Sequence, residues 1–125
     1  MRAIKTEICN FTVPGRAIPA VRMTQRSKFT PRARRYLAYK NQVAWTAKAG
    51  FKGKITSKPV ELNAKFYIHG NRRGDLDNLY KSIADGLNKV VYKDDRQVIS
   101  MNAQLFNCEE SEQRVEVNIH EIESL

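Results

Sequence analysis

Apolar and polar side chains alternate along several stretches of this chain, and that alternation predicts β-strands. Every second residue from Val60 to Ile68 is apolar, which indicates a half-buried strand. Less regular alternation predicts further strands at 4–13, 98–108 and 113–122. The acidic stretch 109–112 is expected to join the last two strands as a hairpin.

Two other stretches carry apolar residues three or four positions apart, as helices with one buried face do. The first should begin at Thr30-Pro31, an N-cap followed by proline at the first helical position, and run to about Ala49. Its buried stripe should consist of residues 36, 39, 43 and 47. The second should begin within 75–78 and run to about Tyr92, with apolar positions 76, 79, 83, 87 and 90.

The order of these elements is strand-helix-strand-helix-strand-strand. It predicts one α/β (α+β) domain spanning residues 1–125, with two main helices packed on a mixed β-sheet. A chain of 125 residues is long enough for one core and marginal for two.

Charge is distributed unevenly over this domain. The chain carries a formal net charge of +9, but residues 1–73 hold 17 Lys/Arg against 2 Asp/Glu. Residues 74–125 hold 5 Lys/Arg against 11 Asp/Glu. A local bias on an ordinary soluble surface is the plainer interpretation, but the clustering of basic residues favours a nucleic-acid partner.

The basic side chains expected to contact DNA occupy three places: the loop after the first strand, the start of the first helix and the turn before the second helix. Positive charge at a helix N-terminus opposes the helix dipole, so the residues there could serve a partner. Phe29 is the better candidate for stacking on an unpaired base, because Tyr36 and Tyr39 are expected in the core. The DNA-binding set is Arg16, Arg22, Arg26, Lys28, Arg32, Arg34, Arg35, Arg72 and Arg73.

The chain offers little sign of other ligands or of export. Cys9 and Cys108 have no neighbours at zinc-ligand spacing and are expected to be free thiols. No stretch is apolar and long enough to resemble a signal peptide or a membrane span. We therefore expect a cytoplasmic protein with no membrane partner and no small-molecule cofactor.

Acidic residues gather at two points of the C-terminal half, at Asp75 and Asp77 and again at Asp94-Asp95. Clustered carboxylates repel one another unless a proton, a cation or a metal intervenes, and hard oxygen ligands suit Mg²⁺. The simpler interpretation makes them helix-capping and turn residues. A helix of ~16 residues would hold its ends ~24 Å apart, so the second pair must fold back to meet the first. Spacing alone leaves both interpretations open.

Lys81 lies four residues after Asp77 and four before Asp85, on one face of the predicted helix. The three side chains could form an exposed ladder of charges. Alternatively, Lys81 could stabilise negative charge that develops on a scissile phosphate.

One run of residues closely resembles the signature of the RusA family of Holliday junction resolvases, which are phage- and prophage-associated endodeoxyribonucleases. It comprises Asp75, Leu76, Asp77, Asn78, Leu79, Lys81, Asp85 and Leu87, followed by Asp94, Asp95 and Val98. The stretch 13–22 is similar to a variant branch with the pattern P-G-x-x-x-P-x-x-R. The resemblance implies a homodimer that binds four-way DNA junctions and makes paired, symmetric nicks with Mg²⁺, or with Mn²⁺ in its place.

The resemblance also assigns roles to residues. It implies that Asp75, Asp77 and Asp95 bind the metal, that Asp94 assists them, and that Lys81 is essential for catalysis. Asp85 matches a recurring acid with a supporting role.

The sequence therefore predicts a Mg²⁺-dependent, structure-selective endodeoxyribonuclease that resolves four-way junctions in recombination and repair. Two alternatives stay open. One is a non-catalytic basic DNA-binding protein such as a phage regulator, and the other is a nuclease for branched DNA in general. Cleavage that requires a divalent cation separates the enzymes from the regulator.

Overall fold

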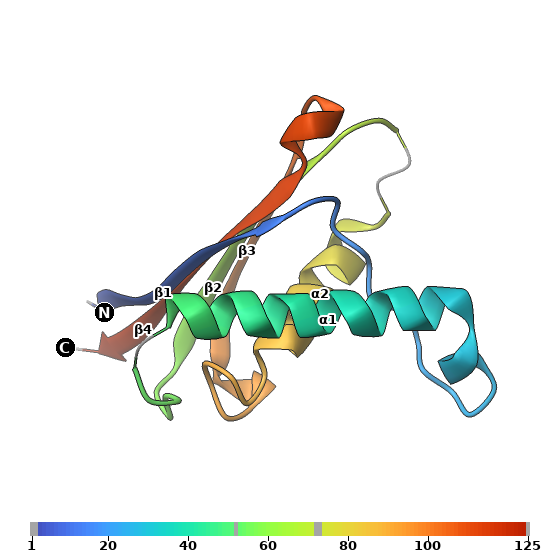
Figure 1. Cartoon of the computed structure of the whole chain (residues 1–125). Coiled ribbons are helices and arrows are strands. Elements are labelled where there is room, and N and C mark those ends of the chain that lie inside the picture. The colour runs from blue at the N-terminus through green and yellow to red at the C-terminus, as the bar shows by residue number, and fades with distance from the viewer. Residues whose placement is uncertain (1–2, 52, 72–73, 125) are drawn as a thin grey trace.

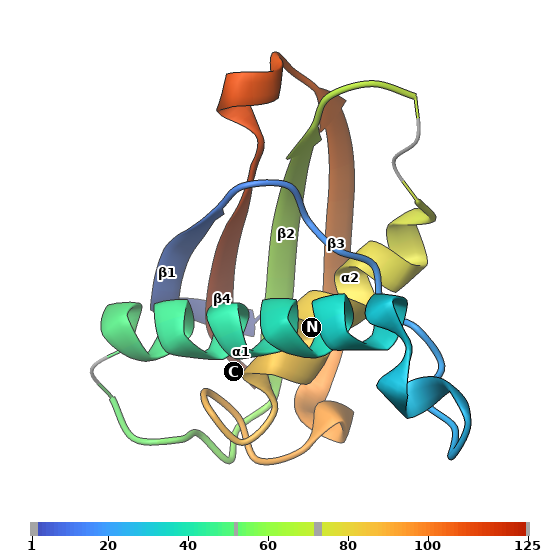
Figure 2. The ribbon, with the colours of Figure 1, turned by 45° about the vertical axis from the view of Figure 1, so that its right-hand side comes forward.

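The computed structural model describes residues 3–51, 53–71 and 74–124. Two helices lie on one face of a four-stranded mixed sheet, which confirms the predicted fold class and element order (Figures 1 and 2). The strands are β1 (Ala3–Pro14), β2 (Val60–Ile68), β3 (Val98–Asn107) and β4 (Arg114–Ser124). The helices are α1 (Pro31–Gly50) and α2 (Leu76–Leu87), and the 3-10 turns are η1 (Ser27–Phe29), η2 (Asp95–Gln97) and η3 (Glu110–Glu112).

The strands lie in the order β1-β4-β2-β3, so β3 and β4 are not neighbours. β3 pairs with β2 in parallel, and β4 pairs antiparallel with both β2 and β1. The predicted hairpin at 109–112 is therefore wrong. The β2-α2-β3 crossover places β3 on the outer side of β2, which leaves only the inner side for β4. The connection between β3 and β4 passes the end of β2, which η3 contacts.

The core lies between the sheet and the two helices. The predicted stripe of α1 is confirmed, since Tyr36, Tyr39, Val43 and Ala47 are all buried. The α1 start is also as predicted, because the Thr30 hydroxyl accepts a hydrogen bond from Ala33 N at 3.2 Å. The largest fully buried side chains are Tyr92, Phe66, Leu62, Ile68, Leu79, Ile83, Leu87 and Ile119.

Helix α2 ends at Leu87, five residues before the predicted end at Tyr92. Lys89 adopts a φ of 65°, in the left-handed region where a helix cannot continue. Val90 has helical spacing in the sequence, but its N–H bonds to Leu87 O at 3.0 Å as part of a turn. Tyr92 is buried beneath the turn and donates its hydroxyl hydrogen to Ala84 O at 2.8 Å. The chain therefore reverses early and returns along α2.

The opposite face of the sheet is polar. Asn10, Asn118, Asn63 and Asn102 stand opposite one another and form a row across all four strands. Asn63 Nδ2 donates to Asn118 Oδ1 at 2.8 Å, and Asn102 Nδ2 donates to Asn63 Oδ1 at 2.7 Å. Such a row fits a sheet that buries only one face. Among the helices described, none has the length and apolarity needed to cross a membrane.

Candidate active site

Asp75 and Asp77 stand at the N-terminus of α2, and both are exposed. Gly74 turns the chain into the helix with a φ of 77°, a conformation that glycine adopts without strain. Asp75 occupies the N-cap position, yet its side chain makes no capping hydrogen bond. Asp77 Oδ1 accepts a local bond from Asn78 N at 2.9 Å. The capping interpretation therefore does not account for the Asp75 carboxylate.

The basic loop after β1 lies against this end of α2. Ala20 N donates to Asn78 O at 2.9 Å, and a Cβ atom added at Gly74 would lie 3.4 Å from Pro19 Cγ. In Figure 2 this loop runs from β1 across the front of the sheet towards α2 and the start of α1. A hollow of about 540 Å³ lies between the loop and the two helices, and Arg22, Arg32 and Asn78 are among its lining residues. Positive side chains thus come close to the acidic helix start.

The predicted DNA-binding residues have different surroundings. Those exposed on the loop and on the first turns of α1 are Arg22, Arg26, Lys28, Arg32, Arg34 and Arg35. Arg16 instead donates to His69 O at 2.8 Å and to Gln113 Oε1 at 2.9 Å, so it ties together loops at one end of the sheet. Phe29 is 67% exposed, with Lys28 Nζ 5.1 Å from its ring centroid. Arg72 and Arg73 lie outside the described residues.

Lys81 and Asp85 continue the acidic face of α2 beyond Asp77. Lys81 Nζ lies 3.4 Å from Asp85 Oδ2, in the i, i+4 relation that the sequence predicted. The same Asp85 oxygen accepts a hydrogen bond from the Tyr36 hydroxyl of α1 at 2.5 Å. No pattern in the sequence pointed to this contact, because the two residues are 49 positions apart.

The loop after α2 brings Asp95 close to the part of the helix that carries Lys81 and Asp85. The pKa of the Asp95 carboxyl is raised overall. Partial burial and the negative charge of Asp85 raise it, and the positive charge of Lys81 opposes them. The three side chains are therefore electrostatic neighbours. The early end of α2 makes this approach possible, but Asp95 meets Asp85 and Lys81 and does not join Asp75 and Asp77, which the predicted metal site required.

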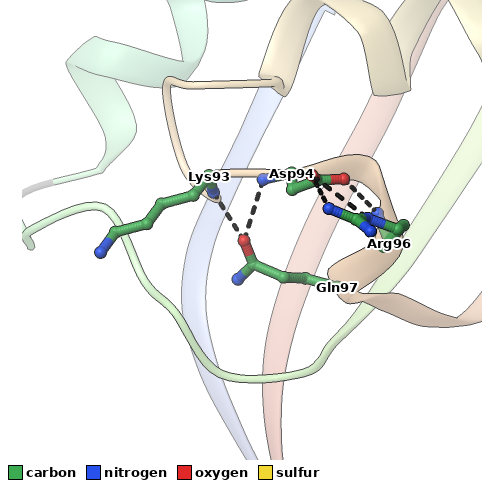
Figure 3. A network of polar contacts seen from close by, with 4 residues as sticks. All are labelled: Lys93, Asp94, Arg96 and Gln97. Atoms are coloured by element: carbon green, nitrogen blue, oxygen red, sulfur yellow. Dashed lines mark hydrogen bonds and ion pairs between the residues drawn. The ribbon is translucent and has the colours of Figure 1, made fainter.

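The Asp94 side chain forms its hydrogen bonds within the loop that carries it (Figure 3). Its Oδ1 accepts from Arg96 N at 2.9 Å, and its Oδ2 accepts from Arg96 Nη2 at 3.0 Å. The Arg96 guanidinium and backbone N–H lower the pKa of the Asp94 carboxyl. Gln97 Oε1 closes the loop by accepting from the backbone N–H groups of Lys93 and Asp94. Asp94 thus caps a turn, as the simpler interpretation of the sequence proposed.

The carboxylates fit a magnesium site only in part. Within the described residues, no three of the His, Cys, Asp and Glu side chains gather to hold an ion. The structure therefore does not bring Asp94 and Asp95 together with Asp75 and Asp77 as one ligand set. Mg²⁺, however, usually takes only one or two carboxylates, and completes its octahedron with water and substrate phosphate. The exposed pair Asp75 and Asp77 fits that kind of site.

A second hollow, of about 590 Å³, adjoins this pair, and its lining is mainly apolar. It is bounded by Asp75, Leu76, Asp77, Tyr80, Met101 and Ala103. Met101 is 63% exposed on the edge strand β3. Sequence reasoning missed it, because the pattern at 98–108 indicates a strand but not its place at the edge of the sheet.

Comparison with known proteins gives two matches. A family profile described as endodeoxyribonuclease RusA matches residues 13–120, which is most of the chain. The uncharacterized protein YqaN of Bacillus subtilis (strain 168) is 37% identical over 67 residues. That match covers 54% of this chain and 46% of the relative, so it spans about half of each protein.

Proposed function

The chain belongs to the RusA family of endodeoxyribonucleases, and from this premise we propose that it resolves four-way DNA junctions by divalent-metal-dependent hydrolysis. The family is one of Holliday junction resolvases, whose activity is generally divalent-metal-dependent. One observation of this chain carries the proposal. An exposed acidic pair, Asp75 without a capping bond and Asp77 in the first turn of α2, stands beside the basic loop and the basic start of α1.

Asp75 and Asp77 are the proposed ligands of Mg²⁺, or of Mn²⁺ in its place. When bound, the ion would polarise the scissile phosphate and activate a water. Lys81 stands one turn further along α2 with its side chain 62% exposed, so it can reach a phosphate oxygen and stabilise charge on it. Asp95 is the proposed further acid of the site. Asp94 would have to leave Arg96 before it could assist.

Exposed basic residues would hold the DNA around this centre. The backbone contacts are proposed for Arg22, Arg26, Lys28, Arg32, Arg34 and Arg35. Phosphate contacts of this kind are independent of sequence and release counterions. Phe29, at the end of η1 directly before α1, is the side chain proposed to stack on an unpaired base at the junction centre.

Paired, symmetric cuts require two active sites related by a two-fold axis. Each chain supplies one Asp75–Asp77 pair, so we propose that the active form is a homodimer. Its role would be in recombination and repair, in a phage or prophage setting.

The proposal is tested with Asp75→Asn and Asp77→Asn on a synthetic four-way junction in Mg²⁺. Each variant should lose nicking by several orders of magnitude, since a neutral amide lacks the negative charge with which a carboxylate holds the cation, while junction binding persists. Glu110→Gln is the matched control, because it makes the same chemical change on the exposed turn η3. Wild-type nicking rates in both aspartate variants would refute the assignment.

The same assay separates the two alternatives. Because no three of the described carboxylates gather to hold an ion, a protein that binds junctions without cutting them is the main competitor. Salt-sensitive binding of the wild type with no nicks in Mg²⁺ or Mn²⁺ would support it. Equal cutting of forks, flaps and four-way junctions would instead identify a general nuclease for branched DNA.

A further inference from the structure

We propose that Tyr36 is a positioning residue: through Asp85, it holds Lys81 in place for the cleavage step. The inference rests on the proposed function, in which Lys81 acts on the scissile phosphate. It adds a residue of α1 to a site otherwise built on α2 and the loop that follows it. Neither spacing nor charge in the sequence pointed to this residue.

The geometry is a short chain of contacts from the interior to the surface. Tyr36 is 4% exposed, the Asp85 side chain 22% and the Lys81 side chain 62%. Tyr36 Oη and Lys81 Nζ both reach Asp85 Oδ2, at 2.5 Å and 3.4 Å. Asp95 lies close enough to Asp85 and Lys81 for their charges to shift its pKa. A buried phenol is thus linked to an exposed ammonium by one shared oxygen atom.

The phenol is suited to a permanent donor role. Burial and the neighbouring Asp85 carboxylate raise the pKa of Tyr36 well above its ordinary value, so its hydrogen stays in place over the working pH range. A distance of 2.5 Å is at the short end for a hydroxyl that bonds to a carboxylate. The bond fixes one Asp85 oxygen, and that oxygen in turn restricts the long, flexible Lys81 side chain.

Stability alone gives little reason for this arrangement. An i, i+4 ion pair with one exposed partner contributes little to stability, so stability does not require that the pair be held in one geometry. Tyr39, one turn further along α1, offers a comparison within the same helix. It is also 4% exposed, yet its hydroxyl has no hydrogen-bond partner among the described residues. Helix α1 therefore packs with one tyrosine whose hydroxyl has no partner in the described part of the chain, whereas the Tyr36 hydroxyl meets the acid beside Lys81.

The first experiment compares Tyr36→Phe, Asp85→Asn and the control Tyr39→Phe. Single-turnover cleavage in Mg²⁺ and junction affinity are measured for each variant. We expect Tyr36→Phe and Asp85→Asn to slow cleavage roughly tenfold to a hundredfold, the usual effect of a misplaced catalytic group, with affinity unchanged. Tyr39→Phe should cut at the wild-type rate. If Tyr36→Phe does not fold, Asp85→Asn still tests whether the link from Tyr36 to Lys81 supports cleavage, because that link passes through Asp85.

The second experiment observes Lys81 directly, without cleavage. Carbon-13 relaxation of the Lys81 ε-methylene, assigned with Lys81→Arg, should show faster motion in Tyr36→Phe than in the wild type or Tyr39→Phe. A general loosening of the fold would instead mobilise other lysines as well, and that result would overturn the inference.

The outcomes separate the inference from the proposed function. A wild-type chain that never cuts overturns both. A wild-type chain that cuts, with Tyr36→Phe cutting equally fast, overturns the inference alone. Equal losses of rate and affinity would also overturn it, because they would make Tyr36 a part of the DNA-binding surface.

Discussion

Glu61 is an acid that the sheet buries on its polar face. Its side chain is 10% exposed and lies 2.8 Å from Lys5 Nζ, and it accepts from Asn63 Nδ2 at 3.0 Å and Ser100 Oγ at 3.2 Å. Lys5, followed by Asn63, holds the pKa of Glu61 below its ordinary value of 4.5. A depressed folded-state pKa stabilises the fold above the unfolded pKa, and that stability is lost as the pH falls through the folded value.

Glu61→Gln should therefore be less stable than the wild type at pH 7, and the difference should shrink as the pH falls below about 4.5. Urea unfolding at pH 7 and at pH 3.5 measures both differences. The exposed Glu110→Gln serves as control and should track the wild type at both values. A gap that stays constant between the two pH values would show that the Glu61 carboxylate is not coupled to folding.

Individual residues were predictable where their chemistry is local. Spacing placed Asp77, Lys81 and Asp85 on one helix face, and they lie there. The Tyr36 hydroxyl that bonds to Asp85 comes from the other helix, and Asp95 approaches Asp85 and Lys81 from the loop after α2. No short-range pattern encodes either contact. The family resemblance pointed to the acids but not to Tyr36, because its hydroxyl matters only once α1 lies against α2.

The two helices touch at Gly86. A Cβ atom at this position would lie 2.8 Å from Val43 Cγ1 and 3.0 Å from Lys40 O, so only glycine permits this approach. Gly86→Ala should lower the free energy of unfolding by about 1–3 kcal/mol, the usual range for overpacking, despite the ~1 kcal/mol that alanine gains in helix propensity. It should also slow cleavage by moving Tyr36 away from Asp85.

Denaturant unfolding of Gly86→Ala, Val43→Ala and the double variant measures the clash. Removing the Val43 methyl groups should relieve it, so the double variant should lose less stability than the two single losses combined. Strict additivity would show that the helices already have room at this point.

Elements were predictable where the signals lie within them. Thr30-Pro31 gave the start of α1, and the alternation at 60–68 gave β2. The end of α2 was misplaced, because Val90 continues the helical spacing while it packs from a turn. The prediction of a hairpin at 109–112 was wrong for a different reason. Alternation marks a strand but does not say which strand lies beside it.

At the scale of the whole molecule, the proposed mechanism requires two chains. Sedimentation at micromolar concentration should give about twice the chain mass of 14.4 kDa. On a cruciform plasmid, the two nicks should appear nearly together. A stable monomer that leaves singly nicked junctions would instead favour the general nuclease for branched DNA.

The position of β1 at the edge of the sheet affects the order in which the fold can assemble. In the described sheet β1 pairs with β4 alone, and Ala3 lies opposite Ser124, so the first and the last described strands lie side by side (Figure 1). Pairing strands this far apart in the sequence closes a long loop, which costs entropy. β1 also packs against α1, but it gains its strand partner in the described sheet only when β4 is in place. Contacts this distant along the chain favour slow folding, and a strand that still lacks its partner is the part of the sheet that aggregation would capture.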